Sequence, residues 1–165
     1  MSDKLEIFWP MEGSSEHAVL ALWCAEKIFD NPSPQSFGNC ATMGVIKGDK
    51  LIAVVVFHNW QPEADVIEMS GAAIDPIWLS KRVLLEMYGY IFDVAKCQMV
   101  IQRQSVNNER INRILRRFGY DEIRLPRMRG RDEDEFLFTL TEEKWRENME
   151  KRLKHGRKIK RTVAA

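Results

Sequence analysis

The order of strand-like and helix-like segments is the feature that most limits the folds open to this chain of 165 residues. Apolar residues at helical spacing alternate with short apolar runs, and Gly, Pro and Asn turn signals separate them. The expected elements are a helix over 14–29, strands over 40–46, 50–58 and 65–74, a helix over 81–96, a strand over 97–104, a helix from Asn107 or Asn108 to Gly119, a strand pair over 121–128 and 135–140, and a final helix from Thr141. The strand–helix–strand order over 65–104 implies a parallel pair in an otherwise antiparallel sheet. The predicted class is therefore α+β, with a mixed, mostly antiparallel sheet flanked by helices.

The charge distribution predicts one domain with a basic extension. The 25 basic and 24 acidic residues give a net charge of +1, which by itself argues for neither nucleic acid nor membrane. Residues 151–161, in contrast, hold seven Lys or Arg residues and no acid. We therefore expect a domain over 1–148 and a basic C-terminal extension over 149–165. The extension either binds nucleic acid through its charge or is a disordered, solubilising tail.

Other sequence features exclude several classes of protein. The longest apolar run, residues 51–57, has the length of a strand and not of a membrane span, and the N-terminus lacks the order of a secretory signal. The three cysteines are widely separated and lie apart from the histidines, so neither a disulfide framework nor a metal site is expected. The sequence predicts a cytoplasmic protein without metal or membrane, and leaves monomer and homodimer open.

The segment 107–123, NNERINRILRRFGYDEI, carries a more specific pattern. Its residues Asn108, Ile111, Leu115, Gly119 and Tyr120 fall on the positions of N-x-x-A-x-x-x-[YL]-x-x-x-G-F. With the element order over residues 40–141, this segment resembles the GNAT acyltransferase superfamily. Its ending resembles the branch that acetylates protein N-termini and related amines. The resemblance implies an N-acetyltransferase that moves the acetyl group of acetyl-CoA directly to a primary amine.

The chain departs from this family in the loop that binds the coenzyme pyrophosphate. The family writes the loop Q/R-x-x-G-x-G/A, and aligning Pro76 with the family's proline puts the two glycine positions on Arg82 and Leu84. A helix that begins at Ser80 could still hold an anion through its free N–H groups, assisted by Lys81 and Arg82. Alternatively, both cations face water. The residues expected around the coenzyme are Ala72, Ile74, Trp78, Leu79, Ser80, Lys81, Arg82, Val83, Asn108 and Arg113.

Two residues are candidates for proton transfer. Glu68 interrupts an apolar strand and falls where several protein-acetylating GNAT members place a catalytic glutamate, which predicts a general base. His58 ends the preceding strand and could orient the amine or share the proton transfer. Asn59 and Trp60 follow it and are expected in the acceptor site. The alternatives are a solvent-facing carboxylate, an ordinary surface histidine and a tryptophan that only packs. Leu115 stands where many members have a tyrosine acting as general acid.

Two further functions remain open on the sequence. The scaffold could lack catalysis and act as a binding module, with Arg110, Arg113 and Arg117 on one helical face meeting nucleic acid or a protein. These arginines could also meet coenzyme phosphates or face water. The unusual loop would also suit a phage-type GNAT-like enzyme that modifies DNA bases.

Overall fold

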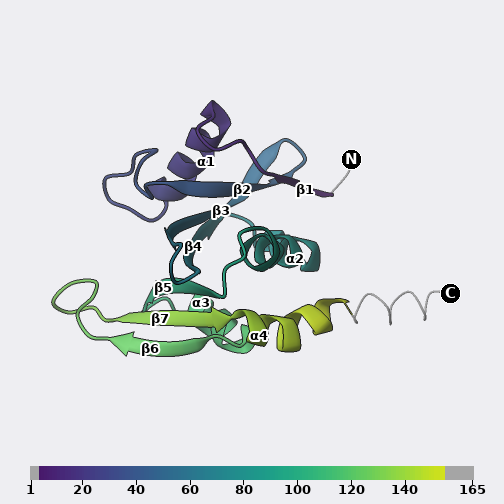
Figure 1. The fold of residues 1–165 in the computed structure, drawn as a ribbon. Helices are drawn as coiled ribbons and strands as arrows, with labels where there is room; N and C mark the ends of the chain where they lie inside the picture. Colours follow the sequence, from purple (N-terminus) through teal and green to yellow (C-terminus); the bar gives the residue numbers. More distant parts are fainter. Residues whose placement is uncertain (1–3, 155–165) are drawn as a thin grey trace. The chain divides into compact units, whose positions relative to one another are not determined.

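The computed structural model describes residues 4–154 and has the predicted α+β class (Figure 1). Its strands are β1 (Leu5–Phe8), β2 (Cys40–Lys47), β3 (Lys50–Gln61), β4 (Val66–Ala73), β5 (Met99–Ser105), β6 (Asp121–Leu125) and β7 (Glu135–Thr141). Its helices are α1 (Ser15–Glu26), α2 (Lys81–Gly89), α3 (Glu109–Phe118) and α4 (Glu142–Lys144), with a 3₁₀ turn η1 (Pro76–Trp78) and π-type turns η2 (Tyr90–Val94) and η3 (Trp145–Glu150). The strands form a mixed, mostly antiparallel sheet flanked by helices.

The chain divides into two units. The first comprises Met1–Glu63 and Ile67–Met87, and the second comprises Ala64–Val66 and Tyr88–Ala165. The strand order is β1-β2-β3-β4 in the first unit and β5-β7-β6 in the second.

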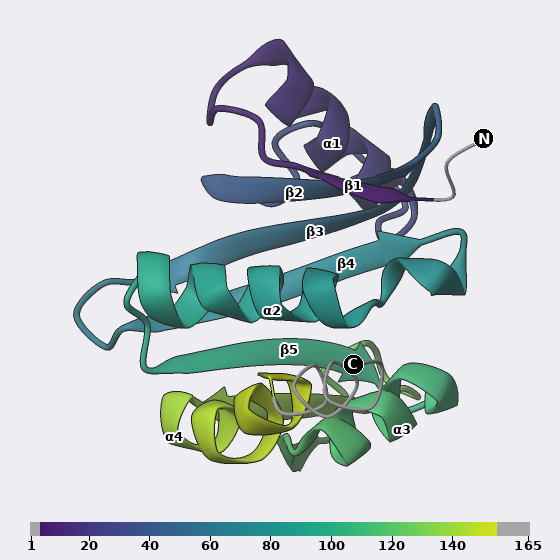
Figure 2. The same cartoon turned by 90° about the vertical axis from the view of Figure 1, so that its right-hand side faces the viewer.

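The sheet of the first unit carries a helix on each face. Helix α1 packs on β2 and β3, where the buried residues are Leu20, Cys24, Ala25, Phe37, Val54 and Val56 (Figure 1). On the opposite face the Trp9 ring stacks on Phe57, and its Nε1 donates to Glu86 of α2 at 2.7 Å. Figure 2 shows α2 running along β3 and β4. Because strand side chains alternate between faces, His58 points to the α1 side with Val54 and Val56.

The antiparallel pairing of β2 with β3 fixes which side chains are neighbours on that face. The two strands are joined by a tight turn at Gly48, whose φ of 61° suits glycine. The register pairs Cys40 with His58 and Thr42 with Val56. His58 therefore lies beside the start of β2.

The second unit is built around stacked aromatic rings. Strand β7 pairs antiparallel with both β5 and β6. Tyr88, Phe92, Phe118 and Trp145 stack on one another with ring centroids 4.5 to 6.4 Å apart. The Tyr88 and Tyr120 hydroxyls lie 2.6 Å apart, and burial raises the pKa of both phenols, so both stay protonated. This is a closed structural network rather than an exposed site.

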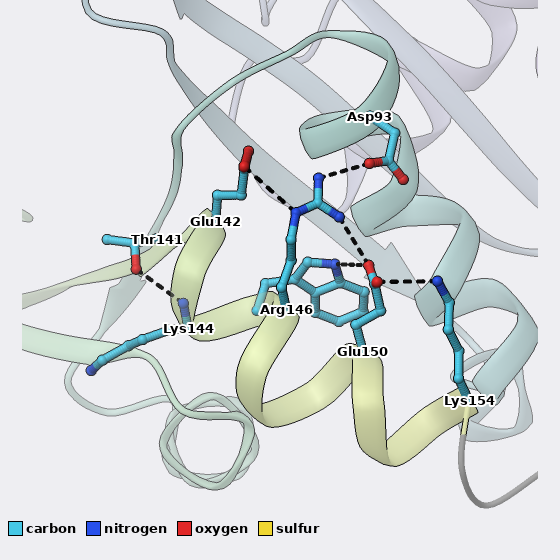
Figure 3. Close-up of polar contacts among 8 residues, drawn as sticks. Asp93, Thr141, Glu142, Lys144, Arg146, Glu150 and Lys154 are labelled. Atoms are coloured by element: carbon cyan, nitrogen blue, oxygen red, sulfur yellow. Dashed lines mark hydrogen bonds and ion pairs between the residues drawn. The ribbon is translucent and has the colours of Figure 1, made fainter.

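Ion pairs fasten the last helical segment to the second unit (Figure 3). The guanidinium of Arg146 contacts carboxylate oxygens of Asp93 at 2.8 Å, Glu150 at 3.2 Å and Glu142 at 3.5 Å. The helical stretch continues to residue 154. The predicted boundary between residues 148 and 149 falls inside this stretch, and the basic residues beyond 154 lie outside the described part of the chain.

The predicted helix ends agree with the structure at several positions. Ser14, Ser80 and Thr141 each accept a backbone N–H with the side-chain oxygen, at 3.2, 3.2 and 3.3 Å. Gly119 ends α3 with a φ of 107°. Asn108 precedes α3 as expected, and its side chain makes no capping hydrogen bond.

Other bounds differ from the sequence prediction. Strand β1 was not predicted, because four residues are too short for a periodic signal. Helix α1 ends at Glu26 and not at residue 29, and β3 runs past His58 to Gln61. The helix expected over 81–96 is α-helical only to Gly89 and continues as η2. Within residues 4–154, no helix is long and apolar enough to cross a membrane.

Candidate active site

A cluster of polar side chains lies on the α1 side of β3 and β4, within the first unit. Its members are His58, Asn59, Glu68 and Ser70. Both predicted proton-transfer residues are buried: His58 is 7% exposed and Glu68 is 6% exposed. The Nδ1 atom of His58 lies 3.8 Å from Oε2 of Glu68. The structure thus brings these two residues together, and neither is the surface residue of the alternative interpretation.

The carboxylate of Glu68 accepts a hydrogen bond from an uncharged side chain. Asn59 donates from Nδ2 to Oε2 at 2.6 Å. Among residues 4–154, no Lys or Arg forms an ion pair with Glu68. Glu68 is therefore a buried carboxylate without the fixed counter-charge that a structural ion pair supplies.

Asn59 has an unusual backbone conformation that directs its side chain. Its φ of 50° lies in the left-handed region, which asparagine tolerates better than most residues. Such conformations occur disproportionately at functional sites, where neighbouring structure maintains them. The neighbouring Trp60 is 55% exposed, so burial in the core does not account for it.

Ser70 is the member of the cluster that sequence reasoning missed. Its Oγ lies 2.8 Å from Nε2 of His58. Phe37 packs edge-on against the imidazole, with ring centroids 5.0 Å apart. Strand alternation puts Ser70 on the same face as Glu68, but only the pairing of β3 with β4 brings Ser70 to His58. His58 therefore lies between a hydroxyl and a carboxylate.

The turn before α2, where the resemblance places coenzyme pyrophosphate, uses its own N–H groups internally. The N–H of Ile77 donates to the Asp75 carboxylate at 3.0 Å. The N–H groups of Trp78, Leu79 and Ser80 donate to backbone carbonyls of the same turn at 3.3, 3.4 and 2.9 Å. The turn itself therefore offers no free N–H groups at residues 77–80 to a phosphate.

The first turn of α2 remains as a possible anion site. The N–H groups of Lys81 and Arg82 have no partner within the helix, because the first residues of any helix lack one. Both side chains are exposed. Arg82 also donates from Nη1 to the carbonyl of Leu5 at 3.1 Å. With two N–H groups and two cations, this position is better suited to bind one phosphate group than a pyrophosphate.

The other predicted coenzyme residues of the first unit are divided between core and strand. Val83 is fully buried, so its side chain serves the core. The N–H of Ile74 donates to the carbonyl of Ile52 at 2.9 Å and is not free for a ligand. Ala72 is half-buried on β4.

In the second unit, Asn112 is buried whereas the predicted coenzyme residue Asn108 is exposed. Asn108 is exposed and reaches only Gln104, at 3.5 Å, and Arg113 is exposed. Asn112 is buried and donates to the carbonyl of Ser105 at 3.0 Å, while its Oδ1 has no hydrogen-bond partner in the described residues. The buried orphan oxygen fits an N–H donor from a ligand or a water.

Comparison with known proteins identifies the fold through structure and not through sequence. No family model matches the chain, and no curated protein matches it in sequence. A spermidine N-acetyltransferase from Vibrio cholerae, solved as a dodecamer, is 12% identical with a TM-score of 0.66, covering 90% of this chain and 99% of that one. A candidate acetyltransferase from T. thermophilus is 16% identical with a TM-score of 0.65, covering 94% of each chain.

The chain has the fold of these acetyltransferases. The fold predicted from the GNAT resemblance is therefore confirmed. At this identity the likeness concerns the fold, so the chemistry must be argued from the residues of the cluster on β3 and β4. Within residues 4–154, no group of His, Cys, Asp and Glu side chains is arranged to hold a metal ion.

Proposed function

We propose that this protein is an N-acetyltransferase that moves the acetyl group of acetyl-CoA to a primary amine by direct transfer. The observation that carries the proposal is the buried Glu68 carboxylate on β4 of an acetyltransferase fold, with Asn59 and His58 as its partners. Acetyl-CoA supplies an activated thioester.

The cluster supplies what the amine needs. A primary amine is protonated near neutral pH and must lose a proton before it can attack a carbonyl carbon. Glu68 takes that proton, while Asn59 holds the Glu68 carboxylate in place. His58 shares the proton transfer with Glu68. Trp60, which follows Asn59 in the chain and is exposed, would contact the acceptor in this proposal. No cysteine nucleophile is required.

Coenzyme binding in this proposal depends on the first turn of α2. Lys81 and Arg82 would hold a phosphate there, with their backbone N–H groups, and the half-buried Trp78 and Leu79 would line its approach. Lys81→Glu is the cleaner test of the phosphate site, because Arg82 also hydrogen-bonds to β1. Lys81→Glu should weaken the thermal stabilisation by coenzyme A, which for the wild type reaches about 2.7 kcal/mol at 100 times the dissociation constant.

The central test is acetyl transfer by the Glu68→Gln variant. Purified protein is assayed with acetyl-CoA and a panel of amines, including spermidine, which the name of one structural neighbour suggests, and a peptide with a free N-terminus. Loss of a general base lowers turnover by roughly 100- to 10,000-fold. The control is Glu63→Gln, an exposed carboxylate outside the cluster, which should retain wild-type turnover. Wild-type turnover in Glu68→Gln would remove Glu68 from the mechanism.

A binding module without catalysis is a second candidate, and one observation favours it. The N–H groups of the turn before α2 are used internally, which suits a scaffold that has no coenzyme to hold. On α3, Arg110, Arg113 and Arg117 are exposed and form no ion pair within the described residues. Absence of a thermal shift with millimolar coenzyme, together with DNA binding that weakens as salt rises, would favour the module.

A phage-type role in DNA base modification and a cytoplasmic location stay predictions, as do the oligomeric state and a nucleic-acid role for the basic extension.

A further inference from the structure

We propose that Ser70 is a nucleophile that accepts an acyl group from an activated ester or thioester, with His58 as its base. The product is an ester-linked acyl-enzyme, which water then hydrolyses. This activity does not rest on the proposed amine transfer, because it needs no amine acceptor and no particular coenzyme.

The geometry around His58 is that of a nucleophile, a base and an orienting carboxylate. Ser70 Oγ lies 2.8 Å from Nε2, within the distance that proton transfer requires. Glu68 Oε2 lies 3.8 Å from Nδ1, the second ring nitrogen. Serine at one imidazole nitrogen and a carboxylate at the other is the arrangement that activates a serine hydroxyl on several unrelated folds.

The surroundings of the ring favour the productive tautomer. A carboxylate 3.8 Å from Nδ1 favours the proton on that nitrogen through its charge, without a hydrogen bond, and so favours Nε2 as the acceptor for the Ser70 hydroxyl. Asn59 holds Glu68 Oε2 at 2.6 Å, and Phe37 packs edge-on against the imidazole. Both contacts limit rotation of the groups that must stay aligned. In this step Glu68 is a positioning residue.

The reaction balances without any further reagent. The Ser70 oxygen attacks the acyl carbonyl carbon as its proton passes to His58 Nε2. The bond from that carbon to the leaving sulfur or oxygen then breaks, and the leaving group takes the electron pair and the proton from the imidazolium. Water repeats the sequence on the ester, with His58 again accepting the proton, and releases the carboxylic acid and free Ser70.

Cys40 is the competing nucleophile on the same face. Its Sγ lies 3.6 Å from Nε2 of His17, whose other ring nitrogen lies 3.0 Å from the Thr42 hydroxyl. Burial raises the pKa of the Cys40 thiol, and the charge of Glu12 raises it further. A thiol that resists ionisation is a weaker nucleophile than an ordinary cysteine, and the mapped position of the label distinguishes Cys40 from Ser70.

The test is covalent labelling of the protein without an amine. Full-length protein is incubated with p-nitrophenyl acetate, or in a second arm with acetyl-CoA, and its intact mass is followed with the release of nitrophenolate. We expect one added acetyl group, mapped by peptide fragmentation to Ser70 and removed by alkaline hydroxylamine, as an ester is and an acetylated lysine is not. Ser70→Ala should abolish this label, and Ser15→Ala, an exposed serine, should retain it.

A second variant separates chemistry from packing. His58→Gln keeps a hydrogen-bonding side chain near Ser70 but cannot take its proton, so acylation should slow by roughly 100-fold or more while the fold is retained by circular dichroism. Equal labelling in Ser70→Ala, or a label that maps to Cys40 or to lysines alone, overturns the proposal. Amine transfer without any label on Ser70 would also overturn the Ser70 proposal, but would leave the proposed acetyltransferase intact. A labelled Ser70 without amine transfer would support the Ser70 proposal and contradict the proposed acetyltransferase.

Discussion

Among residues 4–154, each unit buries one glutamate, and the two are held by partners of different charge. Glu135 of the second unit is 1% exposed and lies between two arginines, with Arg103 Nε at 3.0 Å and Arg129 Nε at 3.4 Å from its oxygens. Glu68 of the first unit is 6% exposed and is held by the amide of Asn59 and the ring of His58.

The difference lies in the charge of the partners, and under the proposed function it separates a structural carboxylate from a reactive one. Arginine remains protonated at any ordinary pH, so the two guanidinium groups fix the charge of Glu135 and tie the start of β7 to β5 and the hairpin loop. Asn59 carries no charge, and histidine, unlike arginine, is not permanently charged, so Glu68 has no fixed counter-charge. Burial alone therefore does not mark a catalytic carboxylate; the chemistry of its partners does.

The largest effect is expected from removing both arginines around Glu135. The double variant Arg103→Leu/Arg129→Leu leaves a buried carboxylate without a counter-charge, which costs about 3–5 kcal/mol of unfolding free energy. Denaturant titration measures the loss. The exposed Arg131, changed to Leu, is the control and should alter stability by no more than about 0.5 kcal/mol. A loss below about 1 kcal/mol in the double variant would show that Glu135 reaches water without its partners.

Glu68→Gln should give the reverse pattern. Its partners are not fixed cations, and a glutamine of the same shape can still form hydrogen bonds, so we expect a stability change within about 1 kcal/mol. The acetyl transfer of the proposed function should fall by orders of magnitude in the same variant. A stability loss as large as that of the double arginine variant would place Glu68 with Glu135 as a structural residue.

The sequence predicts the fold well because periodicity and turn chemistry are local. Ser14, Ser80, Thr141 and Gly119 occupy the helix ends where they were expected, since a cap depends only on residues a few positions away. Strand β1 escaped prediction because its pairing with β2 is a long-range property.

The candidate site was predicted only in part, for the same physical reason. Glu68 and His58 were identified, but their distance depends on the pairing of β3 with β4. Ser70 was missed because a serine in a strand has no signal of its own. The internal use of the N–H groups in the turn before α2 was equally hidden, because no residue type announces which carbonyl its N–H will reach.

A smaller effect is expected at Asn59, and two substitutions separate its two roles. Asn59→Gly and Asn59→Ala both remove the hydrogen bond to Glu68, but only alanine must also adopt the left-handed backbone, at about 1–2 kcal/mol. Alanine should therefore unfold more easily than glycine by about 1 kcal/mol in denaturant. Transfer activity should fall in both to a similar degree if the hydrogen bond positions the base. Equal stability of the two variants would mean that the backbone relaxes out of the left-handed region.

The smallest expected change in stability concerns Asp134, which lies in the loop directly before Glu135. The backbone N–H of Arg127 and the guanidinium of Arg124 hold the pKa of this carboxyl below its ordinary value of 3.8. A lowered pKa in the folded state means that the charged form stabilises the fold above about pH 3.8, and that this stability is lost as the pH falls through the lowered value. Asp134→Asn should therefore melt slightly below wild type at pH 7, and the two melting curves should converge below pH 3.8. A gap that persists in acid would assign the effect to hydrogen-bond geometry and not to charge. Asp134 ends the loop and Glu135 begins β7, so these two carboxylates are adjacent in the chain, and what each contributes to stability is set by its partners.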